Sequence, residues 1–284
     1  MGRSKKSVEA TRVAVRKRDP VRFLVVGDFM TDVYWHGVVT GLSAEAPIPK
    51  VQITLKEVHQ GGAGNVLANL RSLGATVICP NADYWSDNED IIFKLPIKNR
   101  LIVGGLQIAR WDENDSCKEI LKEHAVLALT EPEVDRIVIA DYNKGAIGNE
   151  LLAHLYELNL PTFVDTKRDP TIYVGWVTAI FPNLTEYERY ADAYNKFERC
   201  VVTEGPQGAS VLEFGKVIEK CPAFTTDVVS VCGAGDTFSA AFAYRWPRKD
   251  ALQFANLAAA VVVGKPLTST VSLSEISDLR RKLK

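Results

Sequence analysis

The sequence predicts an α/β protein: a three-layer, doubly wound and mostly parallel sheet with a small β lid. Short apolar runs rich in β-branched residues recur along the chain and alternate with segments whose apolar residues have helical spacing. Most of these runs end in Asp, Asn or Glu, so one edge of the sheet carries a row of polar side chains. This alternation is typical of parallel sheets, whose ligands bind at the carboxyl ends of the strands.

Each element follows from its local pattern. Residues 21–26 form an apolar, β-branched run that ends at Gly27-Asp28, as expected of a buried strand. Further strands are expected at residues 76–79, 101–110, 136–140, 162–164, 178–181 and 200–203. Residues 209–214 and 216–218 flank Gly215 and predict an antiparallel hairpin at the far edge of the sheet. Helices are expected before Gly74 and at residues 150–158, 236–246, 251–264 and 274–283.

The composition is that of a soluble protein with a full hydrophobic core, since 46% of the 284 residues are hydrophobic. A formal net charge of -1 gives no basic field, so we expect no nucleic acid partner. The five cysteines are scattered and never spaced C-x-x-C, which argues against disulfides or zinc and favours a reducing cytoplasm. No apolar run approaches the roughly 20 residues of a membrane span, so we expect no membrane contact.

Residues 1–18 differ in composition from the rest of the chain. Their Lys and Arg residues are opposed by a single acidic residue, Glu9, and they lack the apolar core of a signal peptide. We expect a disordered basic tail here and one folded unit over residues 19–284.

Residues 37–57 do not fit a strand of a parallel sheet. Pro47 and Pro49 interrupt the segment, and the apolar residues at 51, 53 and 55 alternate with polar ones, which is the signature of a strand with one wet face. We expect an excursion outside the core, with residues 97–110 as a second candidate. It could be a flap that closes over substrate, a plain surface hairpin or a contact between two copies of the chain.

Residues 231–238 place two glycines directly before a predicted helix. The glycines allow a tight turn, and the N–H groups at a helix N-terminus hold phosphate oxygens without any basic side chain. Asp236 lies in the first turn, where a carboxylate can cap the helix or act as a general base beside a phosphate. Taken alone, the motif favours the cap.

Two other clusters indicate a ligand. Asp28 and Asp32 follow the first strand, where a carboxylate can accept hydrogen bonds from sugar hydroxyls or simply cap the next turn. The glycine cluster at residues 61–64 permits close approach of a ligand to the backbone, and Asn65 offers both a donor and an acceptor. Neither cluster is a dinucleotide-binding or Walker A motif, because G-x-G-x-x-G and Gly-Lys-Ser/Thr are both absent.

With these pieces in order, the chain resembles the ribokinase-like (PfkB-type) carbohydrate kinases from about Val21 to its C-terminus. Five separated motifs carry the resemblance: Gly27-Asp28 with Asp32, Gly61-Gly62-Ala63-Gly64-Asn65, Asn183-x-x-Glu186, Thr203-x-Gly205-x-x-Gly208 and Gly233-Ala234-Gly235-Asp236-Thr237. Within the family, the chain looks most like the heptose 7-phosphate kinase domain of ADP-heptose synthesis. The supporting segments are residues 27–35, 43–49, 141–145, 261–265 and 268–270.

The resemblance implies a catalytic role for two motifs. Asp236 would take the proton from the sugar hydroxyl that attacks the γ-phosphate of ATP. Gly233, Ala234 and Gly235 would offer N–H groups to the charge that develops on the transferred group. Asn183 and Glu186, the latter through water, would arrange magnesium near the phosphates.

The resemblance also implies which residues bind the two substrates. The nucleotide would lie along Thr203, Gly205 and Gly208, with Asn256 near the adenine end. The sugar would be held by Asp28, Asp32, Gly62 and Asn65. Candidates for the phosphate of the sugar itself are Arg110, Lys144 and Lys167.

The chain departs from the family pattern in several places. Ser230 and Cys232 stand where relatives usually carry Asp and Thr at positions associated with a monovalent cation, so potassium activation is in doubt. The chain is shorter than typical relatives within residues 81–110 and 187–200. No nucleotidyltransferase segment follows the kinase motifs, so a second pathway step would need a separate protein.

The sequence therefore leaves three functions open. The favoured one is ATP-dependent phosphorylation of heptose 7-phosphate at the anomeric hydroxyl. A kinase for another sugar, sugar phosphate or nucleoside would use the same motifs. A protein of this fold that binds nucleotide or sugar without turnover is the third, but pure binding does not require a base such as Asp236.

Overall fold

The computed structural model of the chain describes residues 20–80, 95–121, 123, 134–224 and 227–283, so the expected tail at residues 1–18 lies outside the described part. The body is an eight-stranded sheet in the order β12-β11-β10-β9-β8-β7-β1-β4. Its strands are β1 Arg22–Gly27, β4 Thr76–Ile78, β7 Arg136–Asp141, β8 Thr162–Thr166, β9 Ala179–Ile180, β10 Cys200–Thr203, β11 Ala209–Glu213 and β12 Lys216–Cys221. β11 pairs antiparallel with both β10 and β12, and the other neighbours pair in parallel. The predicted fold class is confirmed, including the antiparallel hairpin at the far edge.

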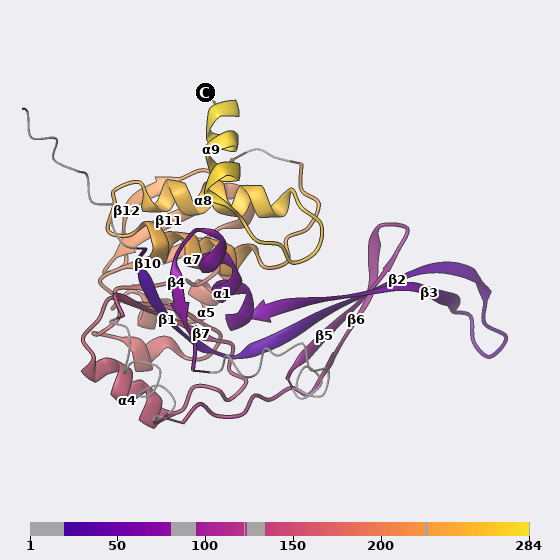
Figure 1. The fold of residues 1–284 in the computed structure, drawn as a ribbon, viewed down its shortest axis with the longest axis horizontal. Coiled ribbons are helices and arrows are strands. Elements are labelled where there is room, and N and C mark those ends of the chain that lie inside the picture. The colour runs from indigo at the N-terminus through magenta and orange to yellow at the C-terminus, as the bar shows by residue number, and fades with distance from the viewer. Residues whose placement is uncertain (1–19, 81–94, 122, 124–133, 225–226, 284) are drawn as a thin grey trace, which may run out of the picture.

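Alternate residues of β1 face two separate cores. Phe23 and Val25 belong to a core shared with α1 (Ala63–Ser72), α7 (Ala234–Arg245), α8 (Ala251–Val263) and α9 (Leu273–Lys282). Leu24 and Val26 belong to a second core shared with α4 (Asn149–Glu157). Each of these four strand residues is fully buried, which is worth about 2 kcal/mol per side chain. Figure 1 shows the resulting three layers, with helices on both sides of the sheet.

Two short helices in the second half of the chain were not predicted. They are α5 (Leu184–Arg189) and α6 (Ala191–Tyr194), which lie between β9 and β10. A signal for α5 was present, because Asn183 and Glu186 have the spacing of a capping box and the structure shows both of its hydrogen bonds. Among the described residues, no helix has the length and apolar character needed to span a membrane.

A second sheet of four strands projects from the body (Figure 1). In spatial order, its strands are β3 Pro49–Gly62, β2 Phe29–Leu42, β5 Ile97–Val103 and β6 Leu106–Glu113. The single strand expected at residues 101–110 is wrong, because Gly104 and Gly105 form the turn of a hairpin at that point. The prediction of one wet face also needs correction. Ile53 and Leu55 are 45% and 52% exposed beside exposed polar neighbours, so both faces of this projecting part are open to solvent.

Candidate active site

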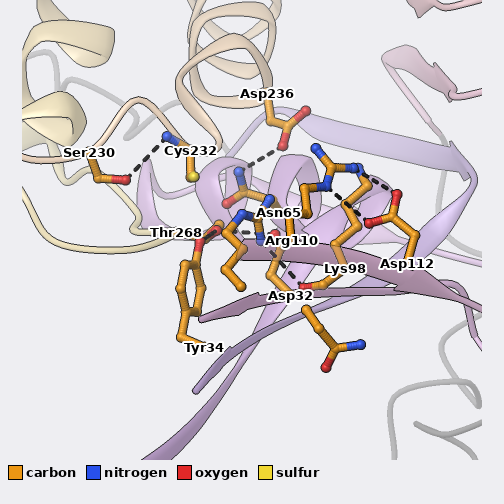
Figure 2. A network of polar contacts seen from close by, with 12 residues as sticks. Asp32, Tyr34, Asn65, Lys98, Arg110, Asp112, Ser230, Cys232, Asp236 and Thr268 are labelled. Carbon is orange, nitrogen blue, oxygen red and sulfur yellow. Dashed lines mark hydrogen bonds and ion pairs between the residues drawn. The ribbon is translucent and has the colours of Figure 1, made fainter. Parts of the chain in front are cut away.

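The site lies where α1 and α7 begin, next to the end of β1. The first N–H of α1, that of Ala63, donates to the carbonyl of Asp28 directly after β1. Asn65 Nδ2 then donates to Asp236 Oδ2 at 2.9 Å and to the Gly233 carbonyl at 3.3 Å (Figure 2). Gly233 has a φ of 74°, and a Cβ at this position would lie 2.4 Å from Asn65 Nδ2. Glycine is therefore required for the two helix starts to approach each other.

Asp236 is held by side chains from outside its own helix. Asn65 donates to one carboxylate oxygen, and the Tyr142 hydroxyl donates to the other. Burial raises the pKa of Asp236 to about 6, although both hydrogen bonds act in the opposite direction. The N-cap of α7 is Gly233, without a side-chain cap. Asp236 is therefore not the N-cap of its helix, and a carboxylate with a pKa of about 6 can accept a proton near neutral pH.

The predicted phosphate cradle adjoins this carboxylate. α7 begins at Ala234, and the first N–H groups of a helix have no acceptor within the helix. A Cβ placed on Gly235 would meet nothing within 4 Å, so this side of the turn is open to a ligand. Just before the turn, Ser230 Oγ accepts a hydrogen bond from the Cys232 N–H at 3.3 Å. The Ala234 N–H already donates to the Val231 carbonyl at 3.3 Å, so the helix start presents its other donors and the positive end of its dipole beside Asp236.

Asp32 is buried in the small sheet but faces the same site. Its Oδ1 accepts a hydrogen bond from Arg100 at 2.7 Å, and its Oδ2 accepts one from Thr268 Oγ1 at 3.1 Å. Thr268 also contacts the Tyr34 hydroxyl at 2.9 Å. Gly62, another predicted sugar residue, is the N-cap of α1 and brings the end of β3 to this point. Figure 2 shows Asp32, Tyr34 and Thr268 below Asn65 and Asp236.

The structure gives Asp28 a different role from the sugar contact we expected. The residue is completely buried, and its two oxygens accept hydrogen bonds from the backbone N–H groups of Lys144 and Ala146, at 3.0 and 2.9 Å. Burial raises the pKa of Asp28, and the backbone hydrogen bonds oppose that rise. Asp28 therefore fixes the loop after β7, a long-range role that differs both from the expected sugar contact and from a cap on the next turn.

Two basic residues of β5 were not predicted from the sequence as site residues. Lys98 is opposite Asp112 in the β5–β6 pairing, and Arg100 is opposite Arg110. Burial lowers the pKa of Lys98, and within the described residues its ammonium group makes no ion pair. Figure 2 shows Lys98 beside Arg110, whose guanidinium binds Asp112 through two hydrogen bonds of 3.0 and 2.8 Å. The alternation of Lys98 and Arg100 would have indicated one basic strand face if the hairpin had been recognised.

The other two phosphate candidates lie elsewhere. The Lys144 ammonium pairs with Asp115 at the surface. The Lys167 ammonium lies 2.9 Å from Asp165 and 2.8 Å from Glu186, at a cavity that Glu186 also lines. Of the three residues proposed for the sugar's phosphate, only Arg110 adjoins Asp32 and Lys98.

Three of the five predicted nucleotide residues, Asn183, Thr203 and Gly205, line a cavity of about 430 Å³. Asn183 and Thr203 form a parallel bridge at its floor, and Gly205 opens the short turn beyond β10. The lining residues are Lys167, Asn183, Leu184, Thr185, Glu186, Arg189, Thr203, Glu204 and Gly205. The volume and the polar lining suit the phosphate end of a nucleotide.

Gly208 and Asn256 meet at the end of β12. Asn256 Nδ2 donates to the Cys221 carbonyl at 3.0 Å. A Cβ on Gly208 would lie 2.1 Å from the same carbonyl oxygen, so the chain passes close to this glycine. Gly208, predicted along the nucleotide, and Asn256, predicted near its adenine end, thus both adjoin the Cys221 carbonyl.

The candidate magnesium residues are already engaged with each other. Asn183 Oδ1 accepts the Glu186 N–H at 2.9 Å, and Glu186 Oε2 accepts the Asn183 N–H at 2.9 Å. Over the described residues, no group of three or more His, Cys, Asp or Glu side chains could hold a metal. These oxygen donors fit a hydrated magnesium ion that is bound mainly by phosphates, which is the usual arrangement for this ion.

Comparison with known proteins agrees with this arrangement. Residues 156–275 match the model of the pfkB family carbohydrate kinases. The chain is 32% identical over 313 residues to the bifunctional protein HldE of Pseudomonas paraeruginosa, which covers 93% of this chain and 65% of that protein. It is 31% identical over 307 residues to HldE of a Nitratiruptor species, covering 93% and 66%. The chain thus spans less than two thirds of the length of these relatives.

Solved structures show the same fold. The microbiome-derived acarbose kinase Mak1 has a TM-score of 0.71 at 15% identity, covering 92% of this chain and 99% of that one. Phosphofructokinase-2 from Escherichia coli has a TM-score of 0.68 at 14% identity, with 93% and 99% covered. Ribokinase from Arabidopsis thaliana has a TM-score of 0.66 at 16% identity, with 92% and 98% covered. These structures show the fold alone, whereas the family match of residues 156–275 and the HldE relatives show a pfkB family carbohydrate kinase domain.

Proposed function

We propose that the protein transfers the γ-phosphoryl group of ATP to a sugar hydroxyl, with Asp236 as general base. The observation that carries this proposal is the position of Asp236. Its buried carboxylate lies at the N-terminus of α7 and is oriented by Asn65, with Asp32 and the cations of the small sheet on the sugar side. A carboxylate with a pKa of about 6 can take a proton from the attacking hydroxyl at neutral pH.

Different residues of the chain would bind the sugar and stabilise the transferred phosphoryl group. Asp32, Asn65 and Gly62 would hold the sugar so that one hydroxyl lies within hydrogen-bonding reach of Asp236. The N–H groups at Gly233, Ala234 and Gly235 would stabilise the charge on the phosphoryl group as it moves. Positioning and electrostatic stabilisation of this kind supply most of the catalysis in this reaction class.

The nucleotide would occupy the cavity beside α5. Thr203, Gly205 and Gly208 would lie along it, and Asn256 would lie near its adenine end. Glu186 and Asn183 would hold the waters of a magnesium ion, which neutralises phosphate charge when bound. We propose that no monovalent cation is needed, because Ser230 and Cys232 form a local turn and offer no carboxylate to such an ion.

The favoured acceptor is heptose 7-phosphate, phosphorylated at its anomeric hydroxyl. Three cations of the small sheet support an acceptor that carries a phosphate: Lys98, Arg100 and Arg110. Arg100 is buried against Asp32, whereas the Arg110–Asp112 pair is exposed and can exchange its partner. Lys98 and Arg110 are therefore the groups that would meet the acceptor's own phosphate. Lys98 has no ion pair among the residues that the structure describes, and burial lowers its pKa, so it gains most from an anionic ligand.

The small sheet would act as the lid over the sugar and as a contact between two copies of the chain. Its projecting part exposes apolar side chains that a monomer has no reason to retain: Val38, Val39, Leu42, Ile53, Leu55, Leu106 and Ile108. The second copy is the occupant that we propose for this surface.

A coupled assay of ADP release tests the proposed function. The panel contains heptose 7-phosphate, the same heptose without phosphate, ribose, fructose phosphates and adenosine, each assayed with ATP and magnesium in potassium and in tetramethylammonium buffers. We expect turnover with heptose 7-phosphate in both buffers and little with unphosphorylated sugars. Binding of ATP and magnesium without ADP release from any acceptor would instead identify a binding protein of the same fold.

A further inference from the structure

Tyr142 touches the candidate base and two lysines at once. It follows β7 directly, and its hydroxyl donates to Asp236 Oδ1. The Lys98 ammonium lies 5.3 Å from the centre of the Tyr142 ring, and the Lys167 ammonium lies 5.6 Å from it. Lys98 belongs to the small sheet on the sugar side, whereas Lys167 lines the cavity proposed for the nucleotide. One phenol side chain therefore joins the two halves of the site to the base.

The backbone on either side of Tyr142 is fixed. Asp141 Oδ2 accepts hydrogen bonds from Arg168 Nε and from the Tyr173 hydroxyl, both at 2.5 Å. On the other side, Asp28 accepts the N–H groups of Lys144 and Ala146. The phenol is thus carried by a short loop held at both ends, which suits it to orient a partner.

Several charged or polar groups face Asp236 from neighbouring elements. Tyr142 faces it from the loop after β7, Asn65 from α1, Lys98 from β5 and Asp165 from β8. The hydrogen bonds from Tyr142 and Asn65 lower the pKa of Asp236, Asp165 raises it and Lys98 lowers it. The pKa of Tyr142 itself is raised well above its usual value by burial, so its hydroxyl keeps its proton and remains a donor.

We infer that Tyr142 is a positioning residue: its hydroxyl holds the Asp236 carboxylate, and its ring holds Lys98 and Lys167 next to the transfer point. This inference rests on the proposed kinase function. Within the Tyr142 side chain, the hydroxyl and the ring make separate contributions. The hydroxyl acts on the protonation and aim of the base, and the ring attracts the two ammonium groups through cation–π interactions.

Two substitutions separate these contributions. Tyr142→Phe removes the hydroxyl and keeps a ring of similar cation–π strength. We expect the acid limb of the kcat profile to move up by about one pH unit, because a hydrogen bond to a charged group is lost, with KM values nearly unchanged. Tyr142→Leu also removes the ring, so we expect KM for both ATP and the sugar to rise about tenfold in addition. Tyr156→Phe is the matched control, since it removes the hydroxyl of an exposed tyrosine on α4 and should leave the acid limb in place.

A titration that does not depend on activity completes the test. Carbon NMR of aspartate-labelled protein, with the Asp236 signal identified from the Asp236→Asn variant, follows the carboxyl directly. We expect the Asp236 pKa to rise in Tyr142→Phe and to stay unchanged in Tyr156→Phe. An unchanged Asp236 titration in Tyr142→Phe overturns the inference about Tyr142. A shifted titration in a protein that phosphorylates no acceptor supports the contact and overturns the kinase assignment instead.

Discussion

Asn65 Nδ2 lies 2.9 Å from Asp236 Oδ2, a hydrogen bond between residues that are 171 positions apart in the chain. It joins the first turn of α1 to the first turn of α7. The Asn65 side chain is itself fixed, because its oxygen accepts a hydrogen bond from Asn69 Nδ2 at 3.0 Å. The orientation of the candidate base therefore depends on a side chain of α1, far from Asp236 in the sequence.

Replacement of Asn65 with Ala should damage catalysis more than binding. The carboxylate loses a donor that stabilises its charged form, so its pKa rises and the acid limb of the rate profile moves to higher pH. We expect kcat at pH 7 to fall about 10- to 100-fold, since the base is also less well oriented. Steady-state kinetics from pH 5 to pH 9 measure both effects. Asn69→Ala, one hydrogen bond further from the base, should lower kcat less. An equal fall of kcat in both variants would contradict direct orientation of Asp236 by Asn65.

The Arg100–Asp32 pair is predicted to matter for stability as well as for sugar binding. Arg100 and Asp32 are 8% and 6% exposed, so Arg100→Met leaves a buried carboxylate without its partner. We expect a loss of about 3–5 kcal/mol in the free energy of unfolding. The matched variant Arg110→Met breaks an exposed pair and should cost less than about 1 kcal/mol. Denaturant unfolding measures both losses. Equal losses of unfolding free energy in Arg100→Met and Arg110→Met would contradict the prediction.

Gly233→Ala should disturb the meeting of α1 and α7. The alanine would have to adopt the positive φ of this position, and its Cβ would lie 2.4 Å from Asn65 Nδ2. We expect a loss of about 1–3 kcal/mol in stability, measured by thermal or denaturant unfolding. Gly235→Ala is the control for stability, because its Cβ meets nothing within 4 Å. Equal stability of Gly233→Ala and the wild type would show that the two helix starts are not tightly joined.

The proposed contact between two copies predicts a dimer in solution. Leu42 and Leu106 are 76% and 72% exposed on the small sheet, and a charge at either position should oppose burial against a second copy. Sedimentation of the double variant Leu42→Glu, Leu106→Glu should show monomers, whereas Ile172→Glu, at an exposed apolar residue of the body, should remain dimeric. A wild-type protein that stays monomeric over a wide range of concentrations would refute the proposed contact.

The main sheet was predictable from the sequence because its strands are short apolar runs with local turn signals. Residues 200–203 were expected as a strand and form β10 with the same bounds. The β5–β6 hairpin was missed because its apolar residues continue across Gly104 and Gly105, and only pairing with β2 reveals the strand boundaries.

The site was predictable at its motifs but not in its side-chain directions. Asp28 and Asp32 have the same sequence signature, yet Asp28 turns into the loop after β7 and Asp32 faces Arg100 and Thr268. Which partners each carboxylate meets depends on strand pairing that spans most of the chain. Tyr142 and Lys98 were missed for the same reason, because neither belongs to a motif near Asp236 in sequence.

The most direct test of the kinase assignment is the pH dependence of turnover with the Asp236→Asn variant beside the wild type. A base with a pKa of about 6 must lose its proton before it can act, so wild-type kcat should fall as the pH drops through about 6 and be level above it. In Asp236→Asn, kcat should be lower by about 10² to 10⁴ while the affinity for ATP, measured by calorimetry, stays nearly unchanged. If Asp236→Asn kept the kcat of the wild type, or lost only its affinity for ATP, the role of Asp236 as the base would be contradicted.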